Sequence, residues 1–154
     1  MSDVVGYTIT RVFDATPDMV WEAWTKPEHF AVWFGTDATQ MVDVELDVRP
    51  GGKWRGTMVV PDGREIHWVG IYREVVEPER LVIDFTDSGE YDGIYDYFTV
   101  TIAPQGERTE MTLTQSGGHL SPEEYEQAKV GTNSFLDTME SLFGTTIKGR
   151  HETA

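Results

Sequence analysis

Few side chains in this sequence stand at spacings that support catalysis or metal binding. The histidines are His29, His67, His119 and His151, and none has a second ligand at the spacing of a zinc site. Neither a Gly-x-Ser-x-Gly nucleophile motif nor a phosphate-binding glycine loop occurs. We therefore predict no metal site and no cofactor, and these patterns assign no catalytic residue.

Acidic residues gather around the stretch "SGEYDG", namely Asp84, Asp87, Glu90, Asp92 and Asp96. Their spacing differs from that of a calcium-binding loop. We interpret these carboxylates as the solvated tip of a hairpin.

Glu74 has a more specific position than the other carboxylates. The segment from Glu65 to Val76 alternates as a strand, and one of its faces carries Trp68, Gly70, Tyr72 and Glu74. A glycine on that face allows a helix to approach closely, so we predict that this face is buried. Glu74 would then be partly withdrawn from water, where a carboxylate can serve as an acid, a base or an anchor. The alternative is a salt bridge with a nearby arginine such as Arg49 or Arg73.

Aromatic residues are numerous for the core of a small domain, with five tryptophans in 154 residues. Most of them must form plain core. Buried indole and phenol groups usually need a polar partner, however, which suits the wall of a cavity. The candidates are Trp24, Phe30, Trp33, Phe34, Trp54, Trp68, Tyr72, Phe85 and Phe135.

The composition indicates one globular domain over residues 1–154, with an ordered core of about 5–145. A net charge of −15 with 12 Lys and Arg argues against nucleic acid and against anionic membranes. We interpret the charge as a solvated acidic surface, with recognition of a partner as the alternative. Without cysteines, disulfides and thiol chemistry are excluded. Because no secretory signal and no apolar run of about 18 residues occurs, we expect a cytoplasmic protein.

The N-terminal part predicts a strand followed by two short helices. The segment from Val5 to Phe13 is rich in β-branched residues and reads as a strand. Thr16 suits a helix N-cap, and Pro17 suits the first helical turn. Pro27 interrupts this helix and can begin a second one.

The middle of the chain predicts an antiparallel meander. Aliphatic residues alternate with acids and would face the core at Val42, Val44, Leu46 and Val48. After the turn at Pro50-Gly51-Gly52, the next strand places Trp54, Gly56 and Met58 on one face. Further strands are predicted at Glu65–Val76, Arg80–Thr86, Tyr95–Ala103 and Thr109–Ser116.

A long amphipathic helix follows the last predicted strand. It begins with a capping box at Ser121 to Glu124 and should end at Gly144, before a loose tail. Because its apolar stripe must be buried, the apolar face of the sheet is the available partner. The sequence therefore predicts an α+β fold in which a curved antiparallel sheet of about seven strands wraps the C-terminal helix. Such an arrangement leaves a cavity.

Three stretches resemble the family named for the activator of heat-shock protein 90 ATPase: "RVFDATPDMVWEAWTKPEHFAVWFG", "DVRPGGKWRG" and "VGIYREVVEPERLVIDFT". The resemblance extends from about Tyr7 to Phe143 and implies the helix-grip fold of the START-like, birch-pollen-allergen-like (SRPBCC) superfamily. It is specific for the family and not for an activity. Members often carry Gly-Trp where this chain has Gly131-Thr132. Either Thr132 leaves more room in the cavity, or another aromatic such as Trp68 replaces the tryptophan.

The leading hypothesis is that the domain binds a small, mostly hydrophobic molecule between sheet and helix. One alternative is an enzyme of the same superfamily, in which Glu74, Tyr72 and Gln115 position and polarise a substrate. Another is a chaperone-interaction module, as the family name suggests. An exposed aromatic patch around Trp33 and Phe34 could pair two chains into a homodimer, or those rings could cap the cavity. The predicted ligand-binding residues are Trp24, Phe30, Trp33, Trp54, Met58, Trp68, Tyr72, Glu74, Phe85, Met111, Gln115, Thr132, Phe135 and Met139.

Overall fold

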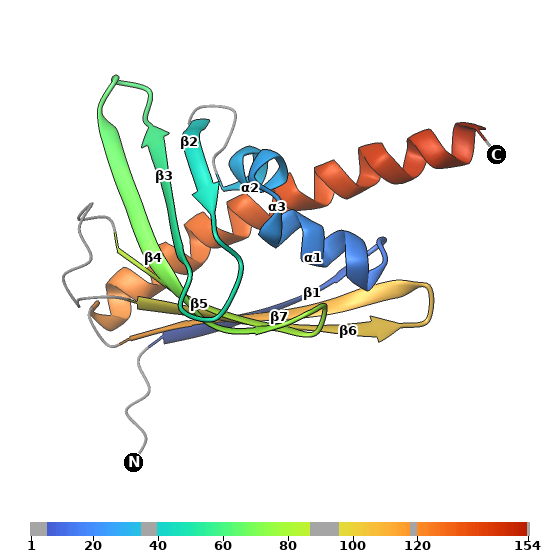
Figure 1. Cartoon of the computed structure of the whole chain (residues 1–154), viewed down its shortest axis with the longest axis horizontal. Coiled ribbons are helices and arrows are strands. Elements are labelled where there is room, and N and C mark those ends of the chain that lie inside the picture. The colour runs from blue at the N-terminus through green and yellow to red at the C-terminus, as the bar shows by residue number, and fades with distance from the viewer. Residues whose placement is uncertain (1–5, 35–39, 87–95, 118–119, 154) are drawn as a thin grey trace, which may run out of the picture.

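A computed structural model describes residues 6–34, 40–86, 96–117 and 120–153 of the protein. The elements follow one another along the chain in the predicted order (Figure 1). They are β1 (Gly6–Phe13), α1 (Pro17–Thr25), α2 (Pro27–Trp33), β2 (Gln40–Leu46), β3 (Lys53–Val59), β4 (Glu65–Val76), β5 (Arg80–Phe85), β6 (Asp96–Gln105), β7 (Arg108–Ser116) and α3 (Pro122–Thr153).

The strands form one seven-stranded antiparallel sheet in the order β1-β7-β6-β5-β4-β3-β2. Strands β2 to β7 follow each other as a meander, whereas β1 pairs with β7, with Ile9 opposite Leu113. Figure 1 shows that the sheet bends strongly, so that β2, β3 and β4 rise from the layer formed by β1, β5, β6 and β7. All three helices lie on the concave side of this bend. The predicted α+β helix-grip fold is confirmed.

Side-chain caps fix where the helices begin. The Thr16 hydroxyl accepts a backbone N–H from the first turn of α1 at 3.2 Å. At the start of α3, the Ser121 N–H donates to Glu124 Oε1 at 2.8 Å, and the Glu124 N–H donates to Ser121 Oγ at 3.1 Å. The end of α3 differs from the prediction, because the helix continues through Gly144 to Thr153. A glycine inside a helix costs only about 1 kcal/mol, and no proline follows to stop the helix.

The double glycine between β2 and β3 is required by the geometry of its turn. Gly51 has a φ of 83°, a left-handed conformation that side chains disfavour. A Cβ atom at Gly52 would overlap the carbonyl oxygen of Asp47. The turn also pairs with β4, because the Gly51 N–H donates to the Tyr72 carbonyl at 2.8 Å and the Tyr72 N–H donates to the Gly52 carbonyl at 2.9 Å.

A bulge in β2 reverses the predicted alternation at the start of that strand. Asp43 has a φ of 54°, and the register with β3 shifts between Val42 and Glu45. An extra residue in one strand exchanges the faces of the residues before and after it. Met41 is therefore buried and Val42 is 40% exposed, so the prediction that Val42 faces the core is wrong.

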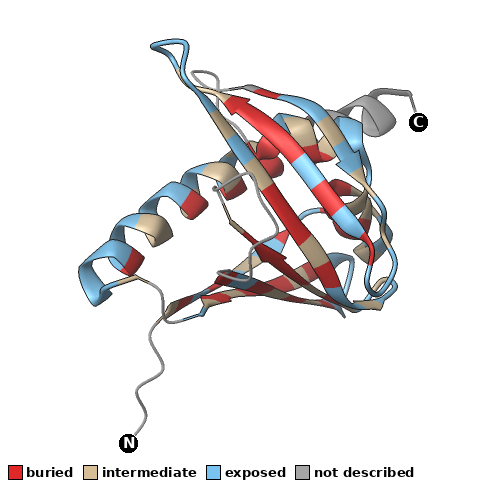
Figure 2. Cartoon of the chain, turned by 60° about the vertical axis from the view of Figure 1, so that its left-hand side comes forward, coloured by how far each residue is buried: buried red, intermediate tan, exposed pale blue. Residues whose placement is uncertain are grey.

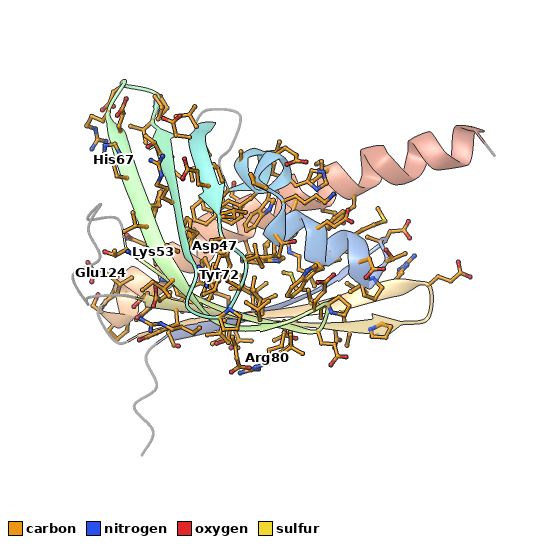
Figure 3. All side chains as sticks on the ribbon, viewed as in Figure 1. Asp47, Lys53, His67, Tyr72, Arg80 and Glu124 are labelled. Atoms are coloured by element: carbon orange, nitrogen blue, oxygen red, sulfur yellow. The ribbon has the colours of Figure 1, made fainter. Side chains whose placement is uncertain are left out.

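A second bulge corrects the prediction for Glu74. The register between β4 and β5 shifts between Tyr72 and Glu74. Tyr72 is buried, whereas the Glu74 side chain is half exposed and Val75 packs against the core in its place. Glu74 Oε1 accepts a hydrogen bond from Arg80 Nε at 2.6 Å. Figure 3 shows Arg80 projecting from the outer side of the sheet, so this ion pair lies outside the core.

The core fills the space between the concave sheet and the helices. Along the strands, buried residues alternate with exposed ones (Figure 2). On α3, Leu136 and Met139 have no exposed surface, and the Phe143 ring meets the Phe13 ring edge to face at 5.1 Å. Gly70 does not admit α3 as predicted. A Cβ atom there would overlap the Asp84 carbonyl oxygen and the Trp54 indole.

Candidate functional site

A cavity of about 390 Å³ lies between the sheet and the N-terminal half of α3. Trp68 of β4, Phe85 of β5, Asp96 and Phe98 of β6 and Gln115 of β7 line it from the sheet. Ala128, Gly131, Thr132 and Phe135 line it from α3. Phe34, Thr86 and Leu120 complete the wall from the connecting segments. The wall is therefore mostly apolar, with a few polar groups.

Five of the residues predicted as ligand-binding come together at this cavity: Trp68, Phe85, Gln115, Thr132 and Phe135. They lie on three strands and one helix, on faces that the alternation and the helical spacing direct inward. Phe34, one of the aromatic candidates, lies beside them, and its ring meets that of Phe135 at 5.2 Å.

The other predicted aromatic residues belong to the solid core. Their indole N–H groups are satisfied by protein atoms: Trp24 donates to the Met111 sulfur at 3.3 Å, Trp33 to the Ala23 carbonyl at 2.6 Å and Trp54 to the Asp84 carbonyl at 2.9 Å. Phe30, Met58, Tyr72, Met111 and Met139 are buried among them. These side chains are buried in the core and are not among the residues that line the cavity.

The predicted exposed aromatic patch around Trp33 and Phe34 is absent from the described surface. Trp33 is 1% exposed and Phe34 is 2% exposed. Both rings pack against Phe30, with centroids at 5.1 Å and 4.8 Å. The interpretation of Phe34 as part of a cap on the cavity agrees with this geometry.

Trp68 differs from the core tryptophans. Its indole nitrogen is buried and has no hydrogen-bond partner among the described residues. A buried donor without an acceptor costs about 1–3 kcal/mol. This unsatisfied N–H belongs to a side chain of the cavity wall.

A buried hydrogen-bond network crosses the polar side of the cavity. The Tyr7 hydroxyl donates to Gln115 Oε1 at 2.5 Å and lies 2.6 Å from Thr132 Oγ1. Gln115 Nε2 donates to Asp96 Oδ2 at 2.7 Å, and the Tyr125 hydroxyl donates to Asp96 Oδ1 at 3.1 Å. The network joins β1, β6 and β7 to α3, so it fixes the polar wall and fastens the helix to the sheet.

Burial raises the pKa of the Tyr7 hydroxyl to about 12. The hydrogen bond with Thr132 lowers that pKa, and the nearby charge of Asp96 raises it. Tyr7 therefore stays neutral over the physiological pH range and remains a hydrogen-bond donor to Gln115.

Asp96 corrects the interpretation of the acidic stretch as a solvated hairpin tip. Asp96 is 8% exposed, and Asp84 has no exposed surface. Asp84 accepts the Ile71 N–H at 2.6 Å and pairs with Arg73 Nε at 2.5 Å. Both carboxylates are thus buried, and Asp96 shares the inward face of β6 with the core residues Phe98 and Val100. Asp87, Glu90 and Asp92 lie outside the described residues.

Sequence reasoning missed the partners of Gln115 and Thr132. Tyr7 was assigned to the first strand without a polar role. Tyr125, one turn before Ala128 on the buried side of α3, was not among the residues singled out. Asp96 was hidden among solvated acids. Only the period-two spacing that places Gln115 on the same face of β7 as Met111 and Leu113 indicated a polar group inside.

The side chains proposed for catalysis do not converge. Gln115 lines the cavity, Tyr72 is buried in the core, and Glu74 faces outward with Arg80. Burial, and secondarily the charge of Asp47, raises the pKa of Tyr72 above its ordinary value. Across the described residues, no three His, Cys, Asp or Glu side chains group as metal ligands.

Residues 14–144 match the family described as Activator of Hsp90 ATPase homolog 1-like protein. The chain belongs to this family. The predicted family membership is therefore confirmed. No curated protein matches the sequence.

Solved structures share the architecture of this Activator of Hsp90 ATPase homolog 1-like chain. A protein from Nitrosomonas europaea is 20% identical with a TM-score of 0.79, covering 95% of this chain and 98% of that one. A protein from Rhizobium leguminosarum is 25% identical with a TM-score of 0.76, covering 93% and 96%. The AHSA1-like protein from Aeromonas hydrophila is 19% identical with a TM-score of 0.74, covering 91% and 94%. These similarities establish the shared fold.

Thr132 and Trp68 are both residues of the cavity wall. Thr132, where the resemblance led us to expect a tryptophan, lines the cavity, and its hydroxyl takes part in the Tyr7 network. Trp68 lines the same cavity from the sheet.

Along the described segments, no helix combines the length and hydropathy that crossing a membrane needs.

Proposed function

We propose that the protein binds a small, mostly apolar molecule in the cavity between the sheet and α3. The observation that carries this proposal is the unsatisfied indole N–H of Trp68 in an aromatic wall. The cavity volume of about 390 Å³ falls within the range of small-molecule sites, which are mostly apolar with a few placed polar groups. A bound molecule with a hydrogen-bond acceptor would satisfy Trp68.

The two rival functions have less support from the geometry. An enzyme using Glu74 needs that carboxylate beside the substrate, and the β4 bulge turns it outward to Arg80. A chaperone-interaction module is suggested by the family description. No described surface feature points to that partner.

The test measures binding of the neutral, apolar fluorophore N-phenyl-1-naphthylamine by its emission and by the melting temperature. At a free concentration of one hundred times Kd, a ligand adds about 2.7 kcal/mol to the free energy of unfolding. For a chain of this size that corresponds to a rise of about 5–10 °C.

Two matched variants locate the binding. Ala128→Trp places an indole in the cavity wall, whereas Val130→Trp places one on the outer side of the same helix, where Val130 is 71% exposed. We expect wild type and Val130→Trp to bind the probe and Ala128→Trp to lose binding. Absence of fluorophore binding to wild type, or undiminished binding to Ala128→Trp, would overturn the proposal that this cavity binds apolar molecules.

A further inference from the structure

The chain has two buried aspartates among its described residues, and they differ in their partners. Asp84 pairs with the guanidinium of Arg73 at 2.5 Å. Asp96 accepts hydrogen bonds from Gln115 and Tyr125, which are both neutral. None of the ion pairs formed by the described residues includes Asp96. Within the described structure, Asp96 is therefore a buried carboxylate without a counter-ion.

The two oxygens of Asp96 have different partners. One accepts a hydrogen bond from the Gln115 amide and the other from the Tyr125 phenol. A buried ionised group is costly unless an opposite charge compensates it. Asp96 also lines the cavity, where each oxygen retains acceptor capacity. A cation that enters the cavity would supply the missing charge, and an anion would be repelled.

The rest of the cavity wall also suits a cation with an organic body. Five aromatic rings line it: Phe34, Trp68, Phe85, Phe98 and Phe135. The faces of such rings attract ammonium groups, and the rings also offer a large apolar surface against which the hydrocarbon part of a ligand can pack. The net charge of −15 adds a long-range field that favours the approach of cations over anions.

We propose that the ligand of this cavity is an organic cation. Its protonated amine or quaternary ammonium would lie beside Asp96 and its apolar body against the aromatic rings, with a hydrogen-bond acceptor for the Trp68 N–H. This proposal rests on the proposed function and names its ligand class. A bare metal ion fits poorly, because the cavity wall offers one carboxylate and Ca²⁺ takes six to eight oxygen ligands.

The test uses three probes of nearly equal shape: 3-phenylpropylamine, 3-phenyl-1-propanol and 3-phenylpropionate. Their affinities for the full chain are measured by isothermal titration calorimetry at neutral pH and low salt. We expect the amine to bind at least about tenfold more tightly than the alcohol, and the carboxylate to bind most weakly.

Two charge variants then assign the preference. Asp96→Asn removes the buried charge and should weaken binding of the amine by about tenfold while retaining binding of the alcohol. Glu126→Gln makes the same change in net charge at an exposed position of α3 and should leave the preference intact. A preference for the amine that survives in Asp96→Asn would overturn the assignment to Asp96.

The wild-type measurements decide the question even if Asp96→Asn does not fold. An alcohol that binds as tightly as the amine would overturn the cation proposal and leave the binding function supported. Failure of both the amine and the alcohol, with N-phenyl-1-naphthylamine still bound, would also overturn the cation proposal. Failure of N-phenyl-1-naphthylamine would overturn the binding function itself.

Discussion

Replacing Gly131 with alanine is expected to stabilise the protein. Gly131 lies inside α3 at the cavity wall, and a Cβ atom there would meet no other atom within 4 Å. The gain is therefore the helix propensity of alanine over glycine, about 0.8–1 kcal/mol in a helix interior. For a chain of this size, about 1 kcal/mol corresponds to a rise in Tm of about 2–4 °C.

Urea unfolding followed by circular dichroism measures this gain as a higher midpoint at an unchanged m-value. Gly70→Ala is the matched contrast, because its Cβ would overlap the Asp84 carbonyl oxygen. That substitution should cost about 1–3 kcal/mol or more. A Gly131→Ala protein no more stable than wild type would refute the reasoning, because the space beside the helix would then have to be filled.

Three other substitutions and conditions have expected outcomes. Asp84→Ala should lower the free energy of unfolding by about 1–3 kcal/mol, because it leaves the part-buried Ile71 N–H without its acceptor. A cost under about 1 kcal/mol in urea titration would contradict this. Glu74→Gln should change stability by no more than about 0.5 kcal/mol, because its pair with Arg80 is solvent-exposed; a larger loss would place Glu74 in the core. Burial raises the pKa of Tyr7 to about 12. The stability that the neutral Tyr7 hydroxyl contributes is therefore complete below about pH 10 and is lost as the pH rises from 10 to 12. Between pH 9 and pH 11.5, the free energy of unfolding should therefore fall by about 2 kcal/mol less in Tyr7→Phe than in wild type. Equal losses would argue against the raised pKa.

The elements of the fold are predictable because their signals are local. Thr16 and Ser121 mark helix starts through caps that involve only neighbouring residues. Alternation marks strands in the same way, and the double glycine marks a turn. Gly144 was misleading as a helix end because a glycine permits a stop without imposing one.

The candidate site is predictable only in part, because it depends on contacts between distant segments. Trp68, Gln115 and Phe135 could be assigned to inner faces by period alone. The outward position of Glu74 depends on a β-bulge between Tyr72 and Glu74, which the residues of this segment do not predict. Likewise, the burial of Asp96 follows from the partners that β7 and α3 bring to it.

The pairing of β1 with β7 has a consequence for how the protein is made. The hydroxyl of Tyr7 meets partners 108 and 125 residues further along the chain. Closing so long a loop costs conformational entropy that the hairpins from β2 to β7 avoid, so the first strand synthesised is expected to dock last. Until α3 has left the ribosome, the nascent chain lacks both Thr132 and the helical wall of the cavity. The binding site is thus completed only when β1 and α3 have docked on the sheet, so binding at this site would indicate that both elements are in place.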